Sequence, residues 1–289
     1  MTLYRIPAEA VAGSANEPEV WDVPIEDQRE AARRLAAHEH KEHVAEVADV
    51  DANGVQARLY RPADALSGLI VHVHGGGFVF NDIEVHDAAV RRFANRARRA
   101  VLSVDYRRPP EHRFPAAVED IDAVLAWLQH REHGPLFVHG DSAGGNLALV
   151  AALRHPDRFE AVALVYPFLD PTQSFDSYDT ATDGFDRREA AWYWEQYAAG
   201  PADLSHPDLA PLRSDDDRLA ALPPTLVVTA EHDPLRDEGE QLARRLDELG
   251  VEVTATRYLG QIHGFWRHEG FRSAERLMRQ VAGFFDSYS

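Results

Sequence analysis

Short apolar segments alternate with longer segments of helical periodicity along most of this chain. The short segments cover residues 69–73, 100–106, 135–139, 161–166, 225–230 and 251–258. Most are continuous apolar runs, which is typical of strands buried on both faces. Helical patterns lie between them, among them residues 145–153 and 236–249. The alternation predicts an α/β fold, with a mostly parallel central sheet flanked by helices.

Two further strands are predicted before this alternation begins. They cover residues 44–50 and 54–60, and Asn53-Gly54 lies at their junction. This dipeptide favours a tight turn between antiparallel strands, because both of its residues readily adopt positive φ. We therefore expect a hairpin at the start of the sheet.

Two segments fall outside the α/β alternation, and we expect them to form a helical cap. The first covers approximately residues 1–43 and includes a predicted helix at 26–40; the second covers approximately residues 171–215. In the second, Asp186 and Glu189 have the spacing of a capping box, which predicts a helix running through Tyr197. A chain of 289 residues with this pattern is expected to form a single domain, residues 1–289.

Composition narrows the classes of function. The net charge is −18, from 30 basic and 48 acidic residues, which argues against a nucleic-acid partner because phosphate contacts require a basic face. Cysteine is absent, so disulfides, thiolate metal sites and a cysteine nucleophile are excluded. No leader-like segment or bilayer-spanning stretch is visible. These features predict a cytoplasmic protein without a membrane span; whether it forms a homo-oligomer is left open.

The segment Gly140-Asp141-Ser142-Ala143-Gly144 carries the strongest chemical signal. It reads G-x-S-x-G and lies between a predicted buried strand and a predicted helix. A serine on such a turn projects from the end of the strand, and the following helix directs its positive N-terminus at the site. The motif alone also occurs in ordinary turns. A hydroxyl is a weak nucleophile, so catalysis by Ser142 requires a base and an oxyanion site elsewhere.

A glycine run supplies the candidate oxyanion site. Gly75, Gly76 and Gly77 follow His74 directly after the strand at 69–73. Backbone N–H groups of such a loop can stabilise a developing negative charge, together with the N–H of Ala143, the residue after the candidate nucleophile. Neither glycine cluster has the spacing of a phosphate-binding loop.

The candidate acid and base follow in the chain order Ser, Asp, His. Asp233 comes just after the strand at 225–230, at the sheet edge where the catalytic groups of open α/β sheets gather. His263 lies in a glycine-flanked loop after the strand at 251–258. The order is that of the α/β-hydrolases. Other residues of the same types compete for these roles: His232, His268, His72 and His74 for the base, and Asp237 and Asp170 for the acid.

Taken together, these motifs resemble the hormone-sensitive-lipase-like group of α/β-hydrolases, the bacterial family IV esterases with an HGGG loop. The similarity covers roughly residues 50–289. It rests on residues 74–78, 140–145, 233–239 and 262–265, and on residues 105–117, which are similar to the family segment DYRLAPEHPFPAA. Arg108, Pro109 and Arg113 depart from that segment, outside the catalytic set.

The resemblance implies a serine carboxylesterase that cleaves short- to medium-chain esters through an acyl-enzyme, with Ser142, His263 and Asp233 as its triad and no cofactor. An amidase or deacetylase would use the same residues, and a non-catalytic ligand-binding protein is the alternative from another class. Phe78, Trp192 and Trp194 are the candidate pocket residues. His38, His40 and His43 do not share a helix face, so no metal site is predicted.

Overall fold

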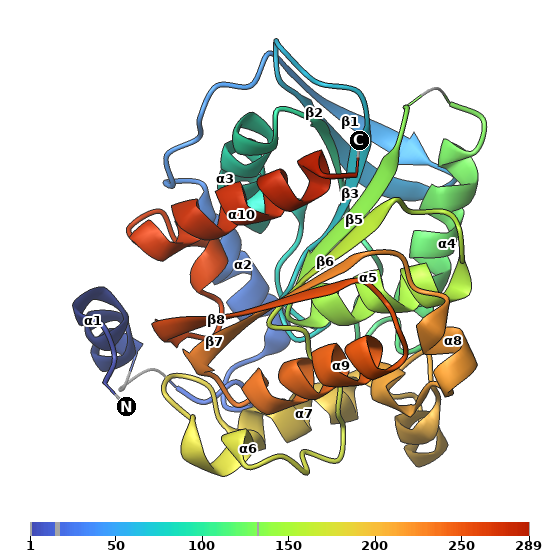
Figure 1. Ribbon diagram of the computed structural model, residues 1–289. Helices are drawn as coiled ribbons and strands as arrows, with labels where there is room; N and C mark the ends of the chain where they lie inside the picture. Colours follow the sequence, from blue (N-terminus) through green and yellow to red (C-terminus); the bar gives the residue numbers. More distant parts are fainter. Residues whose placement is uncertain (1, 15–17, 132, 289) are drawn as a thin grey trace.

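Eight strands form one continuous sheet in the computed structural model, which describes residues 2–14, 18–131 and 133–288 (Figure 1). The order across the sheet is β1-β2-β4-β3-β5-β6-β7-β8. The strands are β1 (Glu46–Ala52), β2 (Val55–Arg61), β3 (Leu69–Val73), β4 (Ala100–Val104), β5 (Leu136–Asp141), β6 (Ala161–Val165), β7 (Thr225–His232) and β8 (Val253–Ile262).

The predicted fold class is confirmed by this topology. Strands β4, β3, β5, β6, β7 and β8 run parallel, whereas β2 is antiparallel to both β1 and β4. The predicted hairpin joins β1 to β2, with Asn53 at φ 59° and Gly54 at φ 89° in its turn. Both values lie in the left-handed region that a two-residue hairpin turn requires.

Helices cover both faces of the sheet. On one face lie α3 (Ile83–Ala97) and α10 (Arg272–Asp286); on the other lie α4 (Ala116–Leu128), α5 (Ala143–Arg154) and α9 (Arg236–Glu248) (Figure 1). Alternate residues of a strand serve opposite faces. In β3, Ile70 packs in the cluster under α3 and α10, whereas Val71 packs in the cluster with α4 and α5. Burial on both faces explains the continuous apolar runs in the sequence.

The two predicted cap segments contain short helices. Residues 1–43 include α1 (Arg5–Ser14) and α2 (Ile25–Ala36); residues 171–215 include α6 (Ser177–Thr180), α7 (Arg187–Tyr197) and the 3₁₀ turns η1 (Pro201–Ser205) and η2 (Pro211–Arg213). The remaining elements are α8 (Asp216–Ala220) and the 3₁₀ turn η3 (Phe265–Arg267). Residues 1, 15–17, 132 and 289 of the predicted single domain lie outside the described residues. The cap and domain boundaries therefore stay predictions.

Two features of the cap helices bear on the predictions. The Asp186 side chain accepts hydrogen bonds from the N–H groups of Arg188 and Glu189 at 2.8 and 2.9 Å, as expected of a helix N-cap. The helix expected at residues 26–40 instead ends at Ala36. The following chain turns toward α3, where Lys41 pairs with Asp87 at 2.8 Å.

Among the described residues, no helix combines the length and apolar character needed to cross a bilayer.

Candidate active site

Ser142 occupies the sharp turn between β5 and α5. Its backbone has φ 55° and ψ −122°, a conformation that is costly for a residue with a side chain. The turn leaves no room for side chains on its glycines. A Cβ on Gly140 would overlap the carbonyl of Gly144, and one on Gly144 would overlap the carbonyl of Val73. Gly140 is therefore required by the tightness of the turn itself, and Gly144 by the packing of the turn against the end of β3.

Ser142, His263 and Asp233 form one continuous hydrogen-bonded chain. His263 Nε2 lies 2.9 Å from Ser142 Oγ, and His263 Nδ1 lies 2.9 Å from Asp233 Oδ2. The three residues follow β5, β8 and β7, so that they meet at the carboxyl edge of the sheet. Asp233 is fully buried, whereas 17% of the His263 side chain is exposed. The imidazole is thus open to a substrate while its carboxylate partner is shielded from water.

The protonation of His263 is set by two opposing effects. Burial disfavours the imidazolium, but the charge of Asp233 and its hydrogen bond favour it. The Asp141 and Glu189 carboxylates act in the same direction as Asp233, and together these groups raise the pKa of His263 above its ordinary value. A base with such a pKa holds an abstracted proton well near neutral pH.

The competing acids and bases serve other contacts. His232 Nδ1 lies 2.7 Å from Asp183 Oδ2, away from Ser142. Asp170 accepts hydrogen bonds from Thr172 and Ser174 within its own loop. The other competing residues also have partners elsewhere: His268 stacks on Phe271, His74 stacks on Tyr106, His72 contacts His139, and Asp237 pairs with Arg236.

The glycine loop contributes two N–H groups to the candidate oxyanion site. Among the hydrogen bonds of the described residues, none is donated by the N–H of Gly76, Gly77 or Ala143. Gly75 differs, because its N–H donates to Asp141 Oδ1 at 3.0 Å. Gly75 was expected in the oxyanion site, but its N–H already has this partner. The sequence did not reveal the contact, since Asp141 belongs to a different strand.

A cavity of about 170 Å³ adjoins Ser142 and His263. Its walls carry the rings of Phe168, Phe185 and Tyr193. Two ionisable groups also face it. Burial raises the pKa of Glu189, on α7, to about 7, and the hydroxyl of Tyr193 donates to Glu189 Oε1 at 2.8 Å. Burial likewise raises the pKa of Asp141 to about 6. The cavity is therefore small, and both aromatic rings and ionisable groups line it.

Comparison with known proteins agrees with this geometry. The alpha/beta hydrolase fold family matches residues 70–267. An arylesterase of Saccharolobus solfataricus is 34% identical over 72% of this chain and 72% of its own length. The ethyl acetate hydrolase of Pseudomonas putida is 33% identical over 75% of this chain and 73% of its own. The solved structure of a hyperthermophilic esterase from Pyrobaculum calidifontis superposes with a TM-score of 0.90, at 35% identity over 99% of each chain.

The chain belongs to the α/β-hydrolase family. The family and the esterase relatives confirm the predicted class of enzyme, a carboxylic ester hydrolase. The part played by each residue of this hydrolase is taken up below as a proposal.

The aromatic residues expected in the pocket do not line the cavity beside Ser142. Phe78 is fully buried and stacks on Tyr197 at 3.8 Å between ring centroids. Trp194 packs against Phe168 at 4.2 Å, behind the cavity wall. Trp192 stacks on Phe80 at 5.9 Å, on another side of α7. These rings pack the cap helix onto the hydrolase core, and this part of the prediction was wrong.

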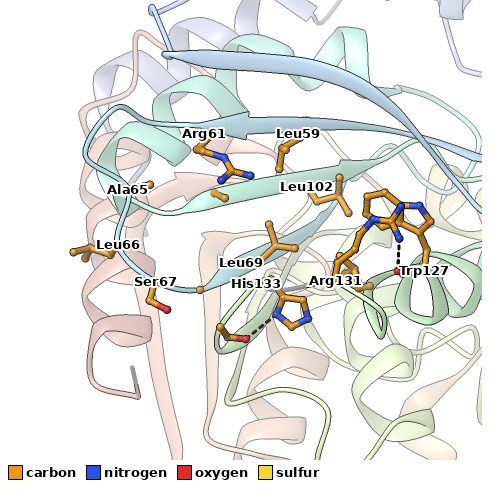
Figure 2. A pocket seen from close by; sticks show the side chains of 14 residues that line it. Leu59, Arg61, Ala65, Leu66, Ser67, Leu69, Leu102, Trp127, Arg131 and His133 are labelled. Carbon is orange, nitrogen blue, oxygen red and sulfur yellow. Dashed lines mark hydrogen bonds between the residues drawn. The ribbon is translucent and has the colours of Figure 1, made fainter.

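A larger cavity of about 650 Å³ lies at the opposite edge of the sheet (Figure 2). It is lined by the first residues of β3 and β4, Leu69 and Ala100, and by Trp127 and Arg131. The Arg131 guanidinium stacks over the Trp127 ring, 3.7 Å from its centroid. Ser67 and His133 also line it, but no hydrogen bond joins them among the described residues, and His133 Nδ1 instead lies 2.7 Å from the carbonyl oxygen of Gly134. The smaller cavity, beside Ser142 and His263, is therefore the candidate active site.

Proposed function

We propose that this hydrolase cleaves short- to medium-chain carboxylic esters in two steps, through an acyl-enzyme on Ser142. The observation that carries the proposal is the chain of two 2.9 Å contacts from Asp233 through His263 to Ser142. A serine becomes a competent nucleophile when an adjacent base is oriented by a third group, and this arrangement supplies both.

In the first step, Ser142 Oγ attacks the ester carbonyl while His263 Nε2 accepts the hydroxyl proton. Asp233 accepts the hydrogen bond from Nδ1–H and stabilises the imidazolium that forms. The carbonyl oxygen becomes an oxyanion, which the N–H groups of Gly76, Gly77 and Ala143 stabilise. The carbon–oxygen bond to the alcohol then breaks, and His263 gives its proton to the leaving alcohol.

In the second step, water takes the place of the alcohol. His263 removes a proton from the water as its oxygen attacks the acyl carbon, and the same N–H groups stabilise the second oxyanion. The bond to Ser142 Oγ breaks, the proton returns to the serine oxygen, and the carboxylic acid leaves. The cycle consumes one ester and one water, and it requires no cofactor.

The size of the cavity supports the preference for small esters. Pockets for drug-sized ligands commonly measure about 300–1,000 Å³, whereas this cavity measures about 170 Å³. Phe185 is buried and lies 4.8 Å from the His263 ring, centroid to centroid, so it limits the space nearest the base. Ethyl acetate, which names the activity of the Pseudomonas putida relative, belongs to the size class that we propose.

Two alternatives use the same site. An amidase or deacetylase would employ the same triad, and anilide turnover beside the matching ester distinguishes it. A non-catalytic binding protein is disfavoured because the nucleophile, base and acid are all present and in contact. A cytoplasmic location stays a prediction, and the oligomeric state stays open.

The proposal is tested with p-nitrophenyl esters from acetate to palmitate and with the variant Ser142→Ala. The wild type should turn over acetate and butyrate efficiently and palmitate poorly. Ser142→Ala should lose at least about 10⁴-fold in kcat, since removal of a nucleophile typically has this scale of effect, while its circular dichroism stays that of the wild type. Near-wild-type turnover by the folded variant contradicts the role of Ser142, and equal turnover of acetate and palmitate contradicts the size limit.

A further inference from the structure

Behind the nucleophile turn lies a buried cluster of histidines that the ester hydrolysis does not use. His72 of β3 pairs in register with His139 of β5, and Asp141 lies two residues further along β5 on the same face. His86 of α3 packs against His72, with ring centroids 5.7 Å apart. All four side chains are almost completely buried. The cluster thus joins the ends of two central strands to the helix that covers them.

Two nitrogens of this cluster lack hydrogen-bond partners among the described residues. They are His72 Nε2 and His86 Nδ1, both fully buried. Folded proteins rarely leave buried polar atoms unpaired, because such atoms have lost their contacts with water and gained nothing in return. Two such atoms in one cluster point to a partner outside the polypeptide, either a buried water or an ion.

The unpaired nitrogens converge with a carboxylate. His72 Nε2, His86 Nδ1 and an oxygen of Asp141 all lie within 4.8 Å of one another. The separation between His86 Nδ1 and Asp141 Oδ1 is 3.9 Å. In a tetrahedral zinc site with bonds of about 2.0–2.2 Å, neighbouring ligand atoms stand roughly 3.4 Å apart. Side-chain shifts on the order of 1 Å would therefore close the three atoms around one ion.

The surroundings suit a metal ligand set. His72 Nδ1 lies 2.9 Å from His139 Nδ1. When His72 donates this hydrogen bond, its Nε2 carries the free lone pair, as in metal sites where an outer partner fixes the tautomer. Burial lowers the pKa values of His72 and His86 well below the ordinary value, which favours the neutral imidazoles that bind metals. Asp141 Oδ1 already accepts from Gly75 N–H, and a carboxylate has lone pairs left for an ion.

We propose that His72, His86 and Asp141 bind one divalent transition-metal ion, Zn²⁺ by the chemistry of the ligands. Two imidazole nitrogens with one carboxylate oxygen suit zinc, whereas Mg²⁺ and Ca²⁺ prefer sites made of oxygen alone. The ion would connect β3, β5 and α3 directly beneath the glycine loop. Its main effect is to stabilise this edge of the fold, and the inference does not depend on the proposed ester hydrolysis.

The test measures metal retention by the full chain. The protein is unfolded with chelator, refolded with ZnCl₂ or with MgCl₂, passed through a desalting column, and analysed for metal by mass spectrometry. Refolding is used because all three ligand side chains are buried in the folded chain. We expect about one zinc per chain, no retained magnesium, and a rise of about 5 °C in Tm with zinc, the scale expected for a tightly bound ligand.

Variants locate the ion. His72→Phe and His86→Phe each remove one ligand but keep a planar ring, and each should reduce zinc affinity by at least about tenfold, since even loss of an outer partner has this effect. The control variant combines His38→Gln, His40→Gln and His43→Gln, which removes three exposed histidines and should leave zinc binding unchanged. Loss of zinc in this control, or retention in both phenylalanine variants, overturns the proposal.

A second measurement covers the case in which the phenylalanine variants fail to fold. Wild-type protein refolded with CoCl₂ should show the intense visible absorption of four-coordinate cobalt, and equimolar zinc should suppress it. Wild-type protein that retains neither zinc nor cobalt contradicts the site, and indicates that buried water satisfies the two nitrogens.

Discussion

His263 and His72 lie at the same edge of the sheet, yet their surroundings favour opposite protonation states. His263 contacts the Asp233 carboxylate at 2.9 Å, and its pKa is raised above the ordinary value. The nearest polar partner of His72 is the neutral ring of His139, also at 2.9 Å, and burial lowers the pKa of His72 far below the ordinary value. A buried histidine thus becomes a proton acceptor when a carboxylate supports its charged form.

The comparison also shows which contacts to look for in a chain with fifteen histidines. His232 has a carboxylate partner too, since it lies 2.7 Å from Asp183. It lacks the second contact, because within residues 2–14, 18–131 and 133–288 only His263 also reaches the hydroxyl of Ser142. The combination of carboxylate and nucleophile, and not either contact alone, distinguishes the proposed base.

The largest expected effect comes from the substitution that distinguishes His263 from His232 as the base. His263→Ala should reduce kcat for p-nitrophenyl butyrate by at least about 10⁴-fold, since the base and the nucleophile act as a unit. His232→Ala serves as the matched control, because it also removes a histidine paired with a carboxylate, and it should retain most of the activity. Steady-state kinetics on both folded variants measure the difference. The opposite ranking would assign the base to His232.

An intermediate effect is expected at the cavity in which His263 lies. Phe185→Ala removes a ring from the cavity wall and should raise kcat/KM for longer esters relative to acetate by about tenfold, because one methylene in an apolar pocket is worth about 1–3 kcal/mol. Trp192→Ala is the control, since it removes a ring of the same cap segment outside the cavity. Chain-length series in the acyl and in the alcohol part measure the change. An altered profile in Trp192→Ala, with none in Phe185→Ala, would refute the assignment of the wall.

The smallest expected effect is a shift in pH dependence. Protonated His263 cannot accept the serine proton, so activity should rise with pH through the pKa of His263. Glu189 favours the protonated form; Glu189→Gln should therefore lower this pKa and move the acidic limb of kcat/KM to lower pH by roughly a few tenths of a unit. Glu195→Gln, on an exposed position of the same helix, should leave the limb in place. A shift to higher pH in Glu189→Gln would contradict the described electrostatics.

Periodic sequence patterns predicted most strands and helices of the core. They did not predict which side chains face the active site on a helix, such as α7, that packs against several neighbours. In α7, Glu189 and Tyr193 are four residues apart and face the cavity beside Ser142. Trp192 and Gln196, also four apart, face residues 20–25. Trp194 packs on Phe168, toward the core. The aromatic cluster was visible in the sequence, but which of these faces meets the active site depends on how the helix docks.

The same distinction applies to the candidate site, where strand ends could be predicted from the sequence and contacts between elements could not. Chain order and strand ends were enough to predict that Ser142, Asp233 and His263 lie together, because parallel strands bring their carboxyl ends to one edge. The contact of Gly75 with Asp141 joins the loop after β3 to the end of β5. The proposed metal ligands likewise come from β3, β5 and α3. Contacts of this kind depend on register and packing, which local patterns do not encode.

Covalent labelling tests the central claim, a nucleophilic Ser142 activated by His263, most directly. The wild type and His263→Ala are treated with a p-nitrophenyl alkylphosphonate, which reacts with activated serines, and the digested chains are mapped by mass spectrometry. We predict one adduct per wild-type chain, on the peptide that contains Ser142, with activity lost in proportion to labelling, and almost no adduct in His263→Ala. Loss of activity with the label on another residue, or equal labelling of Ser142 in both proteins, would contradict the account.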